Sequence, residues 1–315
     1  FGAIPFQIVT KRYLVPTKGQ YDSMALMGWQ VFVLCSVYGW VDKCTGLRRF
    51  REALILVPRS NGKSTMISGV STYGMTKDGE RGADIYLLAN TKEQAGIVYE
   101  ECRNQILASP ALSCRIRALR DRLHYDATAS SIQHRSSDSK RLDGLAPHYA
   151  VFDELHGYRN FALINVIKRG TNKRRNPIIW YISTMGSVLD GPLVHYYQLF
   201  SDALEEGLME KTVSDRLFSF ICEIDPGDDV ADERAWYKAN PSLGQILSMD
   251  MLRDDWARAK GVPAERADFI CKQLNVMVDS GDAGYVDIEV IGRNQGQAGA
   301  ETLLQIPCYG GFDLS

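Results

Sequence analysis

The chain carries ALILVPRSNGKST at residues 53–65, where an apolar run passes into a polar loop that contains glycine. A continuous apolar run of this length is typical of a strand buried on both faces of a parallel sheet. Residues 66–75 then have the character of a helix. Because the N–H groups at a helix N-terminus attract anions, a glycine-containing loop between a strand and a helix can bind phosphate. The stretch therefore predicts a phosphate-binding loop.

The end of this loop, Gly62-Lys63-Ser64, matches the end of the pattern GxxxxGK followed by Ser or Thr. In that pattern the lysine binds the terminal phosphates and the hydroxyl binds Mg²⁺. Val57 stands at the position of the first glycine of the pattern. On the loop alone, an ordinary strand-turn-helix connection is an alternative interpretation.

A second apolar run, residues 149–152, ends in Asp153 and Glu154. Carboxylates at the C-terminal tip of a central strand lie where open α/β sheets bind ligands. We expect Asp153 to hold Mg²⁺ and Glu154 to polarise the water that attacks the γ-phosphate of ATP. Two solvated acids at a strand end are the alternative. The two motifs stand in the order that an ATPase requires, and together they favour ATP hydrolysis.

The rest of the chain supports an α/β fold. Further strand candidates lie at residues 84–89, 178–182 and 217–224. Helical segments such as residues 92–107 separate the strands, which indicates a mostly parallel sheet with helices on both faces. Residues 117–134 hold shorter segments that predict a hairpin added to the sheet. Near the start, we expect a helix within residues 20–40, capped by Asp22 and Ser23.

The character of the sequence changes after residue 225. Residues 232–277 are rich in helical segments with a break at residues 240–244 (NPSLG), and residues 279–301 are polar and rich in glycine. We therefore divide the chain into four parts: a P-loop ATPase core at residues 1–225, a helical lid subdomain at residues 226–278, a connector at residues 279–306 and a final strand at residues 307–315.

Charge and cysteine usage exclude several classes of protein. The net charge is −2, so any contact with nucleic acid must come from local basic patches, of which KRGTNKRR at residues 168–175 is a candidate. The seven cysteines are scattered without a CxxC pair and predict neither a zinc site nor a disulfide framework. The longest apolar run, near residues 31–38, is too short to span a bilayer.

A family resemblance rests on three segments: PRSNGKS at residues 58–64, VFDELH at residues 151–156 and ISTMG at residues 182–186. Together they resemble the ATPase portion of the large terminase subunit of tailed double-stranded-DNA bacteriophages. The resemblance extends from about residue 13 to residue 315. It implies a P-loop NTPase of the additional-strand, catalytic-glutamate type, in which ATP hydrolysis drives viral double-stranded DNA into a procapsid.

The resemblance also implies cofactors and partners. The cofactors are ATP and Mg²⁺, and the partners are double-stranded viral DNA, the portal protein, the small terminase subunit and further copies of the chain in a ring. It places the protein in the cytoplasm of the host bacterium, without a membrane. Two alternatives stay open: another DNA-tracking P-loop ATPase such as a helicase, and a small-molecule kinase.

The resemblance further implies roles for single residues. The residues expected to contact ATP are Gln30, Arg59, Ser60, Asn61, Gly62, Lys63, Ser64 and Thr65. Within this set, Gln30 would contact adenine. Ser64 and Asp153 would hold Mg²⁺, and Glu154 would be the catalytic base.

Two further pairs of residues receive roles in the same way. Ser183 and Thr184 would couple hydrolysis to movement. Arg59 and Arg141 would be the catalytic arginines, with Arg59 as a phosphate sensor and Arg141 as a finger supplied to a neighbouring subunit. An arginine finger raises the rate of phosphoryl transfer by ~10³–10⁵-fold.

Family members also carry a ribonuclease H-like nuclease domain that cuts concatemeric DNA with two Mg²⁺ or Mn²⁺ ions. Residues 310–315 (GGFDLS) resemble the first strand of that domain, with Asp313 as the first metal ligand. The other acids of a two-metal site do not follow in this sequence, so the site is incomplete. We expect this chain to hydrolyse ATP and not to cut DNA.

Overall fold

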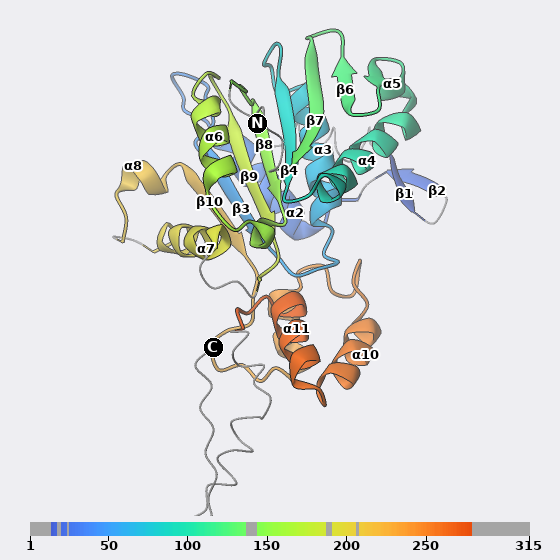
Figure 1. Ribbon diagram of the computed structural model, residues 1–315, viewed down its shortest axis with the longest axis vertical. Helices are drawn as coiled ribbons and strands as arrows, with labels where there is room; N and C mark the ends of the chain where they lie inside the picture. The colour runs from blue at the N-terminus through green and yellow to red at the C-terminus, as the bar shows by residue number, and fades with distance from the viewer. Residues whose placement is uncertain are drawn as a thin grey trace, which may run out of the picture.

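The computed structural model describes residues 14–17, 20–23, 25–136, 144–186, 191–205 and 208–278. The strands of its main sheet are, in chain order, β3 (Glu52–Leu56), β4 (Asp84–Ala89), β5 (Ile116–Ala118), β6 (Arg122–Tyr125), β7 (Ser130–Ser136), β8 (Tyr149–Asp153), β9 (Ile178–Ser183) and β10 (Leu217–Ile221). Across the described part of the sheet their order is β10-β3-β9-β8-β4-β7-β6-β5 (Figure 1). The strands from β10 to β7 are parallel, whereas β6 and β5 run antiparallel to their neighbours. The hairpin predicted within residues 117–134 is confirmed.

Strand β9 lies between β3, which precedes the phosphate loop, and β8, which ends in the acidic pair. Leu56 pairs with Ser183 and Asp153 pairs with Ile182, so the three strands end at the same edge of the sheet. The predicted α/β fold with an additional strand and a mostly parallel sheet is therefore confirmed.

The central strands are buried on both faces. Along β3, Ala53 and Ile55 belong to the core on one face, while Leu54 and Leu56 belong to the core on the other. Neighbouring side chains of a strand point to opposite faces. All four are fully buried, and burying an aliphatic side chain stabilises a fold by about 1.5–3 kcal/mol. The continuous apolar run in the sequence follows from this double burial.

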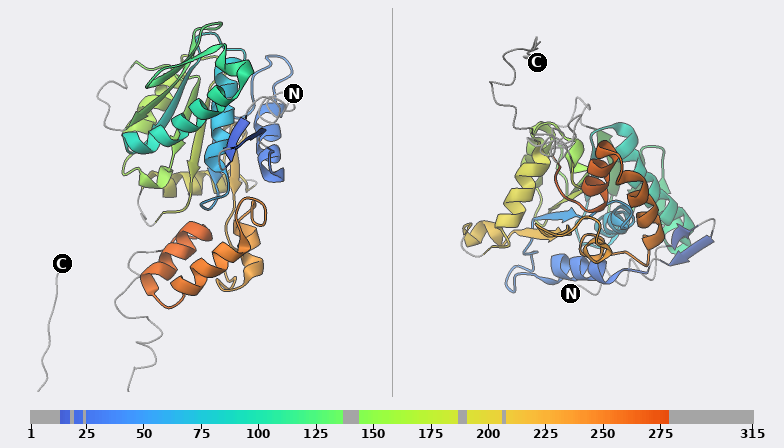
Figure 2. Two further views of the ribbon diagram at one scale, coloured as in Figure 1. Left: turned by 90° about the vertical axis from the view of Figure 1, so that its right-hand side faces the viewer. Right: turned by 90° about the horizontal axis from the view of Figure 1, so that it is seen from below.

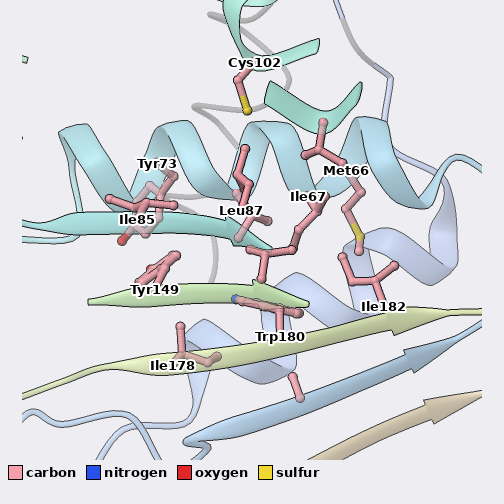
Figure 3. Packing of buried hydrophobic residues seen from close by; sticks show 14 of the residues in the cluster. Met66, Ile67, Tyr73, Ile85, Leu87, Cys102, Tyr149, Ile178, Trp180 and Ile182 are labelled. Atoms are coloured by element: carbon pink, nitrogen blue, oxygen red, sulfur yellow. The ribbon is translucent and has the colours of Figure 1, made fainter. Parts of the chain in front are cut away.

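Helices cover both faces of the sheet (Figure 1). One face carries α2 (Gly28–Gly39), α3 (Lys63–Thr76) and α4 (Lys92–Ala108), and the other carries α6 (Ala162–Thr171) and α7 (Pro192–Asp202). Ile67 of α3 points toward the strands beside Leu87 of β4 (Figure 3). The shorter elements are α5 (Pro110–Ser113), the 3₁₀ helix η1 (Leu155–Gly157) and α8 (Lys211–Ser214).

The start of the described chain differs from the expected helix. Residues Gln20–Ser23 form β2, which pairs antiparallel with β1 (Leu14–Thr17), and α2 begins only at Gly28. The predicted caps Asp22 and Ser23 are therefore wrong. The N–H of Met27 is instead bound by Gln30 Oε1 at 3.0 Å. Residues 20–23 form a strand because they pair with β1, and local helix signals do not reveal such pairing.

Residues beyond β10 form a helical subdomain at one end of the sheet (Figure 2). Its helices are α9 (Glu233–Ala239), α10 (Met249–Ala259) and α11 (Pro263–Gln273), and its own core contains Trp236, Leu252 and Phe269. The helices expected within residues 232–277 are thus present, with the break at residues 240–244 between α9 and α10. Within the described ranges, every helix is too short or too polar to cross a membrane.

Candidate functional site

Three loops meet at the C-terminal edge of the sheet. The phosphate loop follows β3, the acidic pair lies at the end of β8, and Ser183 and Thr184 lie at the end of β9. The ladder between β3 and β9 continues one residue further, because Val57 N donates to Ser183 O at 3.2 Å. The fold therefore brings the predicted phosphate, acid and coupling motifs together.

The phosphate loop has two residues in the left-handed region of the backbone, Ser60 with φ 62° and Gly62 with φ 83°. Gly62 precedes α3, and no side chain caps the N-terminus of that helix. A Cβ on Gly62 would lie 2.9 Å from Ile246 Cδ1 and 3.3 Å from Gln30 Nε2, so this position requires glycine for space as well as for φ. An uncapped helix N-terminus behind such a loop is suited to an anion.

Lys63 lies in the first turn of α3 and is 7% exposed. Its Nζ donates to Val57 O at 2.5 Å and to Pro58 O at 2.7 Å. Burial lowers the pKa of Lys63 to about 8, against the opposing effect of the nearby carboxylates of Glu154 and Asp153. The carbonyls of the loop thus hold the ammonium at the place where a phosphate group would compete for it.

Asp153 and Glu154 have opposite pKa shifts. Burial raises the pKa of Asp153 to about 7, and the charge of Glu154 adds to this while Lys63 opposes it. Burial also acts to raise the pKa of Glu154, but the imidazole of His156 and the charges of Lys63 and Lys272 outweigh it, so the pKa is lowered. Glu154 is therefore the more fully ionised of the two carboxylates near neutral pH.

The backbone of Glu154 is strained. Its φ is 51°, a conformation that costs a residue with a side chain on the order of 1–3 kcal/mol and that clusters at functional sites. Glu154 O accepts a hydrogen bond from Gly157 N at 2.8 Å, which closes the turn from β8 into η1. His156 Nδ1 lies 3.0 Å from Glu154 Oε2. That contact is poorly aligned, and the buried Oε2 has no hydrogen-bond partner among the described residues.

The residues at this edge fit a magnesium ion that arrives with a nucleotide. Within the described ranges, no group of three or more His, Cys, Asp or Glu side chains could hold a metal alone. Mg²⁺ is usually bound by one or two carboxylates together with substrate phosphates. Asp153, buried with a raised pKa, is the carboxylate that a cation would convert to its charged form, and Ser64 in the first turn of α3 offers a hydroxyl.

Ser183 joins the loop after β9 to the loop after β8. Its Oγ accepts a hydrogen bond from His156 N at 3.2 Å, lies 3.1 Å from His156 Nδ1 and donates to Thr184 O at 2.7 Å. Thr184 is also fully buried. A Cβ on Gly186 would lie 2.7 Å from His156 Cβ, which shows how closely the two loops pack. The sequence analysis assigned no role to His156. The one sequence feature that could have indicated a role is its position two residues after Glu154.

Both amide atoms of Gln30, the residue predicted to contact adenine, form hydrogen bonds with backbone groups of the protein. Gln30 is 1% exposed, and its Nε2 donates to Gly62 O at 3.2 Å while its Oε1 binds Met27 N. The side chain therefore links α2 to the phosphate loop. Contact with adenine would require these bonds to be exchanged, and it stays a prediction.

The other predicted loop residues differ in exposure. Arg59 and Ser60 are exposed, and Arg59 N donates to Lys272 O at 3.1 Å. Ser64 and Thr65 are half-buried in the first turn of α3. Their contacts with ATP stay predictions. Arg141 and Asp313, like the predicted connector at residues 279–306 and the strand at residues 307–315, lie outside the described residues.

Asn61 fastens the phosphate loop to the helical subdomain. Its Nδ2 donates to Asn240 Oδ1 at 2.9 Å, and its Oδ1 and its carbonyl accept from Ser242 N at 3.0 Å and from Ser242 Oγ at 2.9 Å. Trp29 Nε1 donates to the same Ser242 Oγ at 2.8 Å. Asn61, Asn240 and Ser242 are almost fully buried. Sequence reasoning missed Asn240 and Ser242 as site residues, although the break at residues 240–244 marks their place.

A strand inserted between the phosphate-loop strand and the acidic strand defines a P-loop nucleoside triphosphatase of the additional-strand class. A family model described as "Terminase large subunit, ATPase domain" matches residues 28–201, and one described as "Terminase large subunit, endonuclease domain" matches residues 211–297. The chain therefore belongs to the terminase large subunit family, and the family expected from the sequence is confirmed.

Two individual relatives are similar to this chain. Protein YmfN of Escherichia coli is 31% identical over 176 residues, which are 55% of this chain and 37% of that protein. The terminase large subunit of Lactococcus phage p2 is 23% identical over 254 residues, which are 79% of this chain and 46% of that protein. The chain thus spans less than half the length of these relatives.

Solved structures show the same fold. The large terminase of bacteriophage HK97 superposes with a TM-score of 0.76 at 21% identity, over 88% of this chain and 55% of that chain. The ATPase domain of the Thermus phage P74-26 large terminase superposes with a TM-score of 0.54 at 16% identity, over 82% of this chain and 95% of that chain.

The residues matched by the endonuclease family model differ from the predicted boundaries of the nuclease part. It begins at residue 211 and includes β10 and the helical subdomain, whereas the sequence predicted a nuclease strand at residues 307–315. In the structure, β10 pairs with β3 inside the ATPase sheet. The boundaries of the four predicted parts stay a prediction.

Proposed function

We propose that this chain hydrolyses ATP with Mg²⁺. The observation that carries the proposal is the alignment of β3, β9 and β8 at one edge of the sheet, which brings Lys63 within electrostatic reach of Asp153 and Glu154. Membership of a family whose matching model is an ATPase domain supports it. The alternative, a simple strand-turn-helix connection, does not account for a buried lysine beside one buried and one half-buried carboxylate.

Each group has a part in the proposed reaction. The N–H groups of α3 and the Lys63 ammonium would bind the phosphates, with Lys63 exchanging the Val57 and Pro58 carbonyls for phosphate oxygens. Ser64 and Asp153 would hold Mg²⁺, which neutralises charge on the phosphates when bound. Ionised Glu154 would orient water and accept its proton.

The arginines would act on the transferring phosphoryl group. Arg59 is exposed on the phosphate loop, as a phosphate sensor requires. Arg141 is proposed on sequence grounds as the finger for a neighbouring subunit. Mixing Arg141→Ala subunits with Glu154→Ala subunits tests action between subunits, because activity should return in the mixture only if the arginine works on its neighbour's ATP.

ATP turnover by the wild type, Lys63→Ala and Glu154→Ala tests the proposal. We expect Lys63→Ala to lose nucleotide binding and Glu154→Ala to bind nucleotide but to lose turnover by about 10²–10⁴-fold, the contribution of a general base. Unchanged turnover in Glu154→Ala would remove that residue from the mechanism, and no turnover by the wild type would remove the ATPase function.

For the whole protein we propose a DNA-packaging motor, in which hydrolysis moves viral double-stranded DNA into a procapsid in the host bacterial cytoplasm. The portal protein, the small terminase subunit and a ring of identical subunits are the proposed partners. The nuclease activity, with Mg²⁺ or Mn²⁺ and Asp313 as first ligand, is likewise proposed for the longer protein. The matches to the terminase ATPase and endonuclease family models and to the terminase large subunit of Lactococcus phage p2 support this assignment.

Duplex DNA added to the ATPase assay distinguishes the candidate functions. A packaging motor should turn over ATP faster when duplex DNA is present. Separation of the strands of a fluorescent duplex would favour a helicase instead. Turnover that requires a small acceptor molecule would favour a kinase.

A further inference from the structure

Lys272 connects the helical subdomain to the nucleotide site. It lies in the last turn of α11, and its carbonyl accepts a hydrogen bond from Arg59 N of the phosphate loop at 3.1 Å. Its Nζ donates to Met185 O at 3.0 Å, in the loop that begins with Ser183 and Thr184. One residue of the subdomain therefore contacts both the phosphate loop and the loop after β9.

The charge of Lys272 acts inside the site. Burial is the main cause that lowers the pKa of Lys63, and Lys272 adds to it. Burial acts to raise the pKa of Glu154, but His156 and Lys63 lower it, and Lys272 again adds to their effect. The position of Lys272 at the site rests on its hydrogen bonds to Met185 and Arg59, one in each of two loops that line it. Among the described residues, the Lys272 ammonium bonds a neutral carbonyl and forms no ion pair with a carboxylate.

The Lys272 ammonium bonds a neutral carbonyl near the predicted phosphate-binding Lys63. A bound phosphate could therefore replace that carbonyl as its hydrogen-bond acceptor. Lys63 would bind the terminal phosphates, and the like charge of Lys272 beside it acts in the direction that a bound phosphate would offset. The bond to the Met185 carbonyl has one charged partner, whereas a bond to a phosphate oxygen joins two opposite charges and adds their Coulomb attraction. A terminal phosphate is therefore the stronger partner for Lys272 than the Met185 carbonyl.

We propose that Lys272 binds the γ-phosphate of ATP and returns to the Met185 carbonyl when that phosphate leaves. This inference rests on the proposed ATPase function and adds a phosphate ligand from the helical subdomain. The exchange makes the position of α11 depend on whether a triphosphate or a diphosphate is bound. It also explains why the contact is made with the loop that follows Ser183 and Thr184.

Binding of two nucleotides to three proteins tests the proposal. The probes are ADP and the β,γ-imido analogue of ATP, each with Mg²⁺. The proteins are the wild type, Lys272→Met and Lys272→Gln. Glutamine can still donate to the Met185 carbonyl but has no charge, so it separates the structural bond from the phosphate contact.

We expect both variants to bind the triphosphate analogue about 10-fold to 100-fold more weakly, the usual effect of losing a hydrogen bond to a charged group. Binding of ADP should stay unchanged. Lys272→Arg should recover most of the loss. Lys260→Met is the matched control, because Lys260 is an exposed lysine of the same subdomain, and it should bind both nucleotides like the wild type.

Three outcomes would overturn the inference in distinguishable ways. If Lys272→Gln keeps the wild-type preference for the triphosphate, Lys272 does not contact the γ-phosphate, and the ATPase proposal stands. If ADP and triphosphate affinities fall together with the unfolding temperature, the lysine is structural. If the wild type binds neither nucleotide, the ATPase proposal and this inference both fail.

Discussion

Asn275 Oδ1 accepts a hydrogen bond from Met185 N at 2.7 Å, and this links the segment after α11 to the loop after β9. Asn275 Nδ2 donates to Cys222 O at 2.8 Å, so one buried amide also connects to the end of β10. The backbone of Asn275 has a φ of 62°. Asparagine is one of the few residues with a side chain that adopts this conformation readily.

Two substitutions of Asn275 separate the contribution of its side-chain hydrogen bonds from that of its backbone conformation. In Asn275→Gly the backbone conformation is retained, but Met185 N and Cys222 O lose their partners, which should destabilise the fold by about 1–3 kcal/mol per buried group left unpaired. Asn275→Ala should lose a further ~1 kcal/mol because alanine is strained at positive φ. Unfolding in urea measures both. Equal stability of the glycine variant and the wild type would show that the two bonds contribute nothing.

The imidazole of His156 should position Glu154 for catalysis. It lies 3.0 Å from Glu154 Oε2 and 3.1 Å from Ser183 Oγ. His156→Ala should lower kcat by about 10²-fold, the effect of misplacing a reacting group, with little change in the affinity for ADP. His195→Ala, which removes an exposed histidine of α7, is the control. A loss of ADP affinity equal to the loss of kcat would instead indicate a collapsed site.

The sequence predicted the parts of the site that follow single strands. Lys63 and the pair Asp153 and Glu154 are found because an apolar run and a polar loop are local patterns. The additional-strand class was implied by the family resemblance, because local patterns predict strands but not the order β3-β9-β8 in the sheet. Those residues stand at the predicted edge because parallel strands place their C-terminal ends together.

What the sequence could not give depends on contacts between distant segments. Ser242 and Lys272 join the site from the helical subdomain through bonds to Asn61 and Met185. The break at residues 240–244 indicates a loop at Ser242, but no local pattern shows that either residue contacts the site. Asp22 and Ser23 were predicted as a helix cap for the same reason, because the strand they belong to is formed by pairing with another strand.

A buried ion pair far from the phosphate loop gives a stability prediction. Arg48 Nη1 lies 2.7 Å from Asp78 Oδ1, with side chains 3% and 5% exposed, and His148 Nε2 lies 2.6 Å from Asp78 Oδ2. Asp78→Asn leaves the Arg48 charge buried without its partner, which should cost about 3–5 kcal/mol. Asp215→Asn is the control, because its pair with Arg49 is 40–42% exposed and should contribute less than about 1 kcal/mol.

The same pair makes stability depend on pH. Burial acts to raise the pKa of Asp78, but His148 and Arg48 outweigh it and hold the pKa below its ordinary value of 3.8. The unfolded state therefore takes up protons first, and the stability from Asp78 is complete above about pH 4 and lost as the pH falls through the folded pKa. The difference in unfolding free energy between wild type and Asp78→Asn should shrink below pH 4. A constant difference from pH 7 to pH 3 would contradict this.

Alanine at two glycines should have opposite effects. Gly62 has a φ of 83°, and a Cβ there would lie 2.9 Å from Ile246 Cδ1, so Gly62→Ala should destabilise the fold by more than about 1 kcal/mol. Gly96 lies inside α4, and a Cβ there would meet nothing within 4 Å. Gly96→Ala should stabilise by about 0.5–1 kcal/mol, because glycine is unfavourable within a helix.

A double variant shows how much of the stability lost in Gly62→Ala comes from the clash with Ile246 and how much from the positive φ of the backbone. Ile246 is 49% exposed, so Ile246→Ala alone should change stability little. If the clash with Ile246 dominates, Gly62→Ala with Ile246→Ala should recover most of the loss in the unfolding free energy. If the positive φ dominates, the double variant should be as unstable as Gly62→Ala, because alanine would still be forced into the left-handed region. A Gly62→Ala protein with wild-type stability would mean that the phosphate loop can adopt a different backbone from the one seen beside the helical subdomain.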